Sequence, residues 1–93
     1  MKKLEIIIEA VEKKSVLNIL NELNVRGYTI INDIHGKGKQ GTRRGSELTN
    51  IMRNSMIIVV DENEIIQTII EKVKEILETY SGIMFLSDAE ILN

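Results

Sequence analysis

The clearest change of pattern along this chain lies at residues 55–66, which read SMIIVVDENEII. Residues 55–60 are a short, mostly apolar run with the length of a strand. Asp61 follows as a candidate helix N-cap, with Glu64 three residues later as in a capping box. Apolar residues then recur every three or four positions over residues 65–80. This stretch therefore predicts a strand that leads directly into a helix.

The amino-terminal part of the chain repeats the same strand and helix order. Residues 4–10 alternate apolar and charged side chains and are rich in isoleucine, which favours a strand. Residues 12–25 place apolar side chains at helical spacing, and Gly27 is the expected stop signal. Residues 28–34 return to residues that favour strands. A second strand therefore precedes the loop that leads to residue 55.

The carboxyl-terminal part completes the pattern. Ser81-Gly82 is the expected end of the second helix, and residues 83–86 predict a fourth short strand. The order βαββαβ is that of a ferredoxin-like α+β fold, a four-stranded antiparallel sheet with both helices on one face. The chain has 93 residues, which is the size of one small domain, so we expect a single domain over residues 1–93.

Both faces of the predicted sheet carry apolar side chains. One alternating set is expected to be Leu4, Ile6, Ile8, Ile30, Ile58 and Val60, and the other Ile7, Ile31, Ile57 and Val59. Two helices cover only one face, so a monomer would expose the second set as an apolar patch. This pattern favours an oligomer in which sheets face one another.

Composition excludes several classes of function. The chain has no cysteine and one histidine, His35, which argues against disulfides, cysteine-ligated zinc and thiol catalysis. Glu5 and Glu9 are expected to form solvated or intersubunit ion pairs rather than a catalytic carboxylate pair, and we assign no catalytic or metal-binding residue. Only three aromatic residues and a net charge of −2 argue against nucleic-acid binding. No apolar run approaches the length of a membrane span, so we expect a cytoplasmic protein.

The segment between the second and third predicted strands differs from the rest of the chain. Residues 36–53 carry a charge of +4, from five basic residues and one glutamate, which leaves −6 for the remainder. Glycines in this segment let the backbone approach a ligand closely, and phosphate is the expected anion. Residues 36–41, GKGKQG, match GxGxxG. They enter a long connection rather than a helix of a parallel βαβ unit, so we do not expect a dinucleotide fold.

Several segments in order resemble one family. These are Gly27-Tyr28-Thr29, the stretch Gly36 to Lys39 followed by Arg43-Arg44-Gly45, and the stretch Tyr80 to Ile83 followed by residues 88–92. Together they resemble the PII signalling superfamily over nearly the whole chain. The sequence looks most similar to the PII-like proteins associated with sodium-dependent bicarbonate transporters.

The resemblance implies a homotrimer with adenine-nucleotide sites in the clefts between subunits. The ligand would be AMP, cyclic AMP, ADP or ATP, with magnesium as a candidate companion. A flexible T-loop at about residues 36–54 would dock on a partner, expected to be a membrane transporter for bicarbonate or another ion. The protein would then be a regulator and not an enzyme, and would lie at a membrane only through that transporter.

The resemblance also implies roles for individual residues. The expected nucleotide-binding residues are Thr29, Ile31, Gly36, Gly38, Lys39, Arg43, Arg44, Gly82 and Ile83. The expected partner-binding residues of the T-loop are Lys37, Gln40, Gly41 and Gly45.

Two alternatives use related architectures. One is a small acylphosphatase-like phosphate hydrolase, although residues 10–12 after the first strand contain no glycine or arginine to hold a phosphate. The other is a trimeric protein of the divalent-cation-tolerance type, which a metal titration would test.

Overall fold

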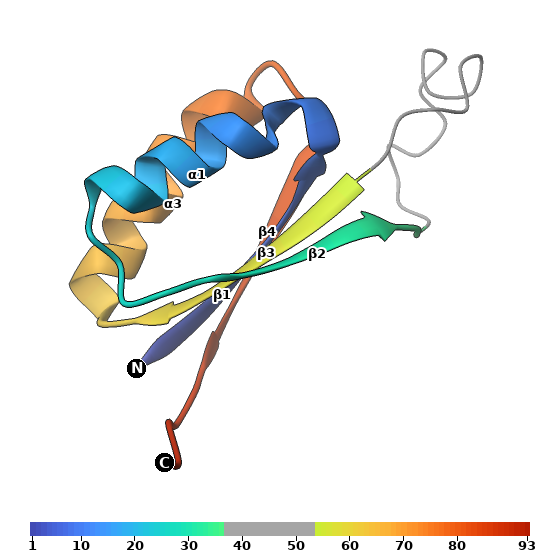
Figure 1. Cartoon of the computed structure of the whole chain (residues 1–93). Helices are drawn as coiled ribbons and strands as arrows, with labels where there is room; N and C mark the ends of the chain where they lie inside the picture. The colour runs from blue at the N-terminus through green and yellow to red at the C-terminus, as the bar shows by residue number, and fades with distance from the viewer. Residues whose placement is uncertain (37–53) are drawn as a thin grey trace.

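Four strands and two main helices make up the part of the chain that the structure describes. This computed structural model describes residues 1–36 and 54–93 (Figure 1). Its elements are β1 (Lys2–Glu9), the short 3-10 helix η1 (Ala10–Glu12), α1 (Lys13–Glu22), β2 (Thr29–Ile34), β3 (Asn54–Asp61), α3 (Asn63–Leu77) and β4 (Gly82–Asp88). The strands form one antiparallel sheet in the order β2-β3-β1-β4. The predicted ferredoxin-like fold is therefore confirmed.

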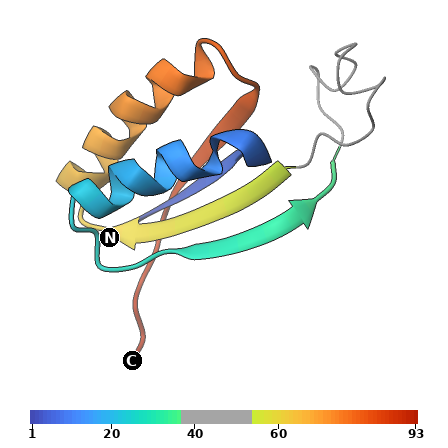
Figure 2. The ribbon, with the colours of Figure 1, turned by 45° about the horizontal axis from the view of Figure 1, so that its top comes forward.

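Both helices pack on the same face of the sheet, as Figure 2 shows. The core between the helices and the sheet is formed by Leu4, Ile6, Ile8, Val16, Leu20, Ile57, Val59, Ile66, Ile69 and Val73, all with no exposed surface. The helical members recur three or four positions apart, so each helix buries one stripe. The strand members alternate, so β1 and β3 each bury one of their two faces.

The prediction of which β3 side chains face the helices is wrong. Ile6 pairs with Ile57 and Leu4 pairs with Val59, so these four side chains lie on the face that the helices cover. Ile58 and Val60 of β3 instead lie on the open face. Alternation within one strand cannot fix which set faces the helices, because that choice depends on the register with the neighbouring strand.

The helix ends also differ from the prediction. Helix α1 stops at Glu22, and the left-handed residue after it is Asn24, with a φ of 56°, whereas Gly27 has no positive φ. Asparagine tolerates this conformation, so a glycine is not needed there. Helix α3 stops at Leu77, and Gly82 already begins β4.

The prediction that Asp61 is the N-cap of the second helix is also wrong. Its N-cap residue is Glu62, and no side chain caps the helix. Asp61 instead ends β3 and is buried. The acidic residue therefore belongs to the sheet and not to the first turn of the helix.

One face of the sheet carries no helix. Its apolar side chains are Ile7, Ile31, Met56, Ile58, Val60, Ile83 and Phe85, as register and alternation place them. Ile31 is 44% exposed, and Ile83 and Phe85 are each 49% exposed. The predicted open apolar face is therefore present, although its members on β3 differ. Among the described residues, no helix is long and apolar enough to cross a membrane.

Candidate functional site

An open pocket of about 340 Å³ lies where β2 begins and β3 ends. It is lined by Arg26, Gly27, Tyr28, Thr29, Ile58, Val60 and Ile91. Ile58 and Val60 supply an apolar surface from the open face of β3. Arg26, Gly27 and Tyr28, from the connection between α1 and β2, form one rim of the pocket.

The carboxyl-terminal segment reaches this pocket from the other edge strand. The Ala89 N–H donates to the Met1 carbonyl at 3.1 Å, so the segment after β4 begins beside the start of β1. Ile91 then lines the pocket and is 52% exposed. Nearby, the Lys2 ammonium donates to the Asp88 carboxylate at 2.6 Å. This hydrogen bond and the positive charge of Lys2 lower the pKa of Asp88 below its ordinary value.

A buried carboxylate supports the rim of the pocket. The Arg26 N–H donates to Asp61 Oδ2 at 2.9 Å, and the Glu62 N–H donates to Asp61 Oδ1 at 2.7 Å. Asp61 is only 1% exposed. This one side chain therefore joins the end of β3 to both the α1–β2 connection and the start of α3.

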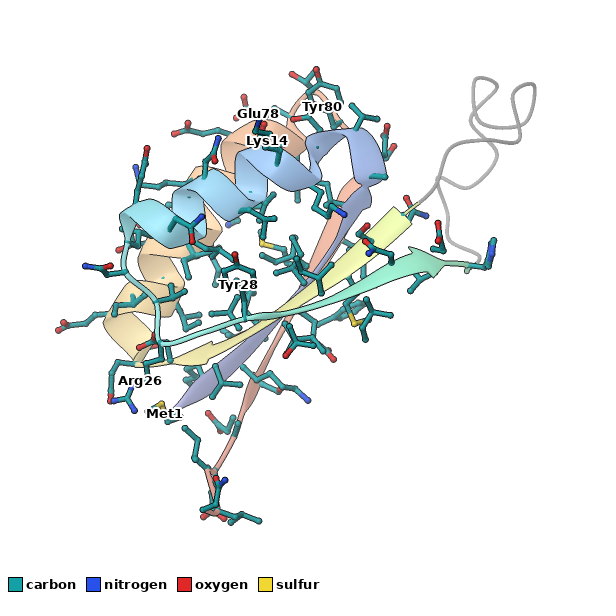
Figure 3. All side chains as sticks on the ribbon, viewed as in Figure 1. Met1, Lys14, Arg26, Tyr28, Glu78 and Tyr80 are labelled. Carbon is teal, nitrogen blue, oxygen red and sulfur yellow. The ribbon has the colours of Figure 1, made fainter. Side chains whose placement is uncertain are left out.

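The Arg26 side chain lies beside the pocket and contacts the carboxylates of Asp61 and Glu62. Its Nε is 3.8 Å from Asp61 Oδ1, and its Nη2 donates to Glu62 Oε2 at 3.3 Å. The side chain remains 59% exposed, so part of the guanidinium faces solvent beside the pocket. Figure 3 shows Arg26 at the end of the molecule that carries Met1, whereas Tyr80 lies at the opposite end.

The predicted nucleotide-binding residues that the structure describes do not meet at one place within the single chain. Thr29 lines the pocket, but Gly36 lies beyond the other end of β2, about 20 Å away at the rise of an extended chain. Gly82 and Ile83 belong to β4, at the opposite edge of the sheet from β2. Three strand spacings separate these edges, which is about 14 Å. Of the predicted residues that the structure describes, Thr29 is therefore the one that lines the pocket.

Ile31 and Ile83 lie on the open face of the sheet. Ile31 pairs with Met56, Met56 pairs with Ile7, and Ile7 pairs with Ile83. The four side chains therefore form a row that crosses all four strands. Neither Ile31 nor Ile83 lines the pocket.

Gly82 has a clear packing role. A Cβ atom at this position would lie 2.6 Å from Leu77 Cδ2 and 2.8 Å from the Ile7 carbonyl oxygen. The preceding turn is held by the Ser81 N–H, which donates to Glu9 Oε2 at 2.9 Å. The turn between α3 and β4 therefore needs a residue without a side chain where it meets β1.

The carboxyl end of β2 is held by polar contacts to two other elements. Lys13 Nζ and Ser55 Oγ donate to Asn32 Oδ1 at 3.0 Å and 3.1 Å. The β2–β3 register then shifts between Ile31 and Ile34, where Asp33 has a φ of 57°. This irregularity redirects β2 just before Gly36.

The remaining predicted residues lie outside the described part of the chain. These are Lys37, Gly38, Lys39, Gln40, Gly41, Arg43, Arg44 and Gly45. Conversely, the sequence pattern predicted no ligand-binding role for Arg26, Ile58, Val60 and Ile91. Their convergence depends on the β2–β3 register and on the path of the carboxyl-terminal segment, for which no local motif exists. Gly27, Tyr28 and Ile91 did carry a signal, since they belong to segments that resemble the PII superfamily.

Comparison with known proteins identifies the family. The family model described as nitrogen regulatory protein P-II matches residues 1–93. The chain belongs to the PII family. This PII chain is therefore a signalling protein and not an enzyme, and the family predicted from the sequence is confirmed.

Solved structures agree with this assignment. A structure of CPII from Thiomonas intermedia K12, a nitrogen regulatory PII-like protein bound to ADP, AMP and bicarbonate, is 30% identical to this PII chain. The match has a TM-score of 0.81 and covers 99% of this chain and 92% of CPII. CPII bound to ADP and bicarbonate matches at 32% identity and a TM-score of 0.81, over 97% of this chain and 86% of that one.

A more distant structure agrees in fold alone. A putative PII-like signalling protein from Thermus thermophilus is 21% identical, with a TM-score of 0.66. The match covers 92% of this chain and 82% of that protein. The sheet and helices described above are therefore shared beyond the CPII structures.

Proposed function

We propose that this PII-like protein binds an adenine nucleotide in a cleft between subunits and passes the bound state to a partner protein. One observation carries the proposal. The pocket at Thr29 and the predicted residues Gly36, Gly82 and Ile83 lie far apart within one subunit. A single site that includes both the pocket and these three residues requires a second copy of the chain.

The open face of the sheet supports such an assembly. Ile31, Ile83 and Phe85 are each more than 40% exposed in the single chain, and they lie on the face that no helix covers. Apolar patches of this kind usually mark interaction surfaces. We propose a homotrimer whose sheets face inward, in which each chain is one PII-like domain over residues 1–93.

The chemistry of the pocket suits a nucleotide base. Ile58, Val60 and Ile91 offer apolar contact to the faces of a ring, while the main chain of Gly27 to Thr29 offers hydrogen-bonding groups for its edge. The ADP and AMP bound to CPII support an adenine nucleotide as the ligand class. Bicarbonate, also bound to CPII, is a candidate second ligand.

Phosphate recognition is proposed for the glycine-rich basic segment. Gly36, Gly38 and Lys39 would lie beside the phosphates, and Arg43 and Arg44 would face them. Charge-assisted hydrogen bonds of this kind contribute roughly 1.5 to 3 kcal/mol each. Phosphate contacts would fix the conformation of the T-loop at about residues 36–54 and so change which partner it fits.

The proposed partner is a membrane transporter for bicarbonate or another ion. Lys37, Gln40, Gly41 and Gly45 would contact it through the T-loop. The protein would be cytoplasmic and would reach the membrane through this contact, with no role for nucleic acid.

Calorimetry together with light scattering tests the proposal. The purified protein is titrated with AMP, cyclic AMP, ADP and ATP, with and without magnesium. We expect micromolar binding of at least one nucleotide, about −8 kcal/mol, to a particle with the mass of a trimer. A folded trimer that binds none of the four nucleotides would contradict the proposed function.

A double substitution tests the phosphate role. Arg43→Ala with Arg44→Ala should weaken ADP and ATP by at least about tenfold, since each lost charge-assisted bond contributes more than about 1.4 kcal/mol. Adenosine should bind almost as before, because it has no phosphate. Titration of wild type and the double variant with adenosine, ADP and ATP checks this. An equal loss for adenosine and ADP would exclude the phosphate role of these arginines.

A further inference from the structure

Asp61 is a buried charge next to the candidate pocket. It is 1% exposed, and among the buried residues that the structure describes it is the one with a charged side chain. Buried charges are unfavourable unless they are well paired, and apolar residues of similar volume are often as stabilising. The geometry around Asp61 therefore needs an explanation beyond the stability of the fold.

Asp61 uses its two oxygens on two different elements. Oδ2 accepts the Arg26 N–H at 2.9 Å, and Oδ1 accepts the Glu62 N–H at 2.7 Å. The Arg26 guanidinium adds a weaker ion pair at 3.8 Å. The short contacts are to main-chain groups, so Asp61 fixes the path of the backbone rather than the position of one side chain.

The backbone that Asp61 holds is the rim of the pocket. At one end of the rim, Thr29 is fixed by its pairing with Ile58. At the other end, Arg26 is fixed by Asp61. Between them, Gly27 has nothing within 4 Å of the place where a Cβ would lie, so packing on that side does not hold it.

We propose that Asp61 is a positioning residue that sets the rim at Gly27 to Thr29 for the base of the bound nucleotide. The inference rests on the proposed function, since it assumes that the nucleotide occupies this pocket. Asp61 does not itself line the pocket. It acts through the main chain of Arg26.

Two substitutions at Asp61 and one control test the inference. Asp61→Asn keeps one oxygen that can accept a hydrogen bond, and Asp61→Leu keeps the branched shape of the side chain with no acceptor. Glu62→Gln is the matched control, because it retains the Glu62 N–H that donates to Asp61 and Glu62 does not line the pocket. All proteins are titrated with AMP and ADP well below their unfolding temperatures.

The expected affinities follow the number of retained acceptors. Asp61→Leu should bind AMP and ADP about tenfold or more weakly, Asp61→Asn should lose less, and Glu62→Gln should stay within about twofold of wild type. The loss should be equal for AMP and ADP, because the rim serves the base and not the phosphates. Partial rescue by asparagine separates positioning from a general loss of packing.

The other outcomes would contradict either the inference about Asp61 or the proposed function. If wild type binds nucleotide and Asp61→Leu binds it equally well, the inference about Asp61 is wrong and the proposed function stands. If wild type binds none, the proposed function fails and the inference fails with it. If the leucine variant does not fold, the affinity of Asp61→Asn and hydrogen exchange of the wild-type amides test the inference instead. Rapid exchange of the Arg26 N–H would show that its hydrogen bond to Asp61 does not hold the rim.

Discussion

At the level of single residues, Gly82 and Gly27 differ in the space around their Cα atoms. A Cβ at Gly82 would overlap Leu77 and the Ile7 carbonyl oxygen, whereas a Cβ at Gly27 would meet nothing within 4 Å. The Leu77 side chain can move, but the Ile7 backbone belongs to β1 in the middle of the sheet. Gly82 is therefore constrained by packing, and Gly27 is not.

This difference predicts unequal effects of the same substitution. Gly82→Ala should lower the free energy of unfolding by about 1 to 3 kcal/mol, as overpacking of a tight contact does. Gly27→Ala, the matched control, should stay within about 0.5 kcal/mol of wild type. Chemical denaturation measures both. Equal transition midpoints for the two variants would show that the contact at Gly82 relaxes without strain.

At the level of elements, the Lys2–Asp88 pair joins the start of β1 to the end of β4. The pairing lowers the pKa of Asp88, so the folded state favours its charged form. The stabilisation is then present at pH values above the ordinary aspartate pKa. It is lost as the pH falls through the lowered pKa of the folded state, where Asp88 becomes protonated.

If this ion pair is removed, we expect the loss of stability to depend on pH. Asp88→Asn should be less stable than wild type at neutral pH, by a small amount because the carboxylate is exposed. The difference should disappear as the solution becomes strongly acidic. Thermal unfolding over a series of pH values checks this, with Lys2→Met as the matched variant. A difference that persisted in acid would show that Asp88 acts by something other than its charge.

Sequence periodicity predicted the type and order of these elements well, for physical reasons. Alternation in β1 and the helical stripe at Ile66, Ile69 and Val73 are properties of short segments, so the sequence displays them directly. The end of α1 was not predictable from glycine, because Asn24 takes the left-handed conformation instead. The local pattern of an acidic residue before a helix resembled an N-cap, while Asp61 in fact pairs with a segment 35 residues away.

The candidate site was less predictable than the fold. The resemblance to the PII superfamily identified Thr29, but Ile58, Val60 and Ile91 reach the pocket through strand register and chain path. Such long-range contacts leave no mark in a local window. The prediction of which β3 residues are buried was wrong for the same reason, because pairing with β1 determines which of them face the helices.

At the level of the whole molecule, the open face of the sheet is the surface on which the proposed assembly depends. Phe85 lies on this face, is 49% exposed and pairs across the strands with Glu5. A lysine at this position would face an opposite charge within its own subunit, which favours the folded chain. In the assembly, the same lysine would be buried against apolar side chains of another copy.

Phe85→Lys should therefore dissociate the oligomer while the subunit stays folded. Light scattering should give the mass of a trimer for wild type and of a monomer for the variant, because burying the lysine charge against apolar side chains of another copy has a desolvation cost that pairing with Glu5 does not offset. Glu71→Lys, at an exposed position of α3, is the control and should leave the mass unchanged. If Phe85→Lys retained the wild-type mass, this face would not be the interface.

The most direct test of the intersubunit site is calorimetric titration of ADP against wild type and the Phe85→Lys variant at equal chain concentration. Phe85 does not line the pocket, so the substitution changes the assembly and not the pocket within one chain. We predict that wild type binds one ADP per chain and that the monomeric variant shows no measurable binding. A folded monomer that bound ADP with wild-type affinity would contradict the claim that two subunits complete the site.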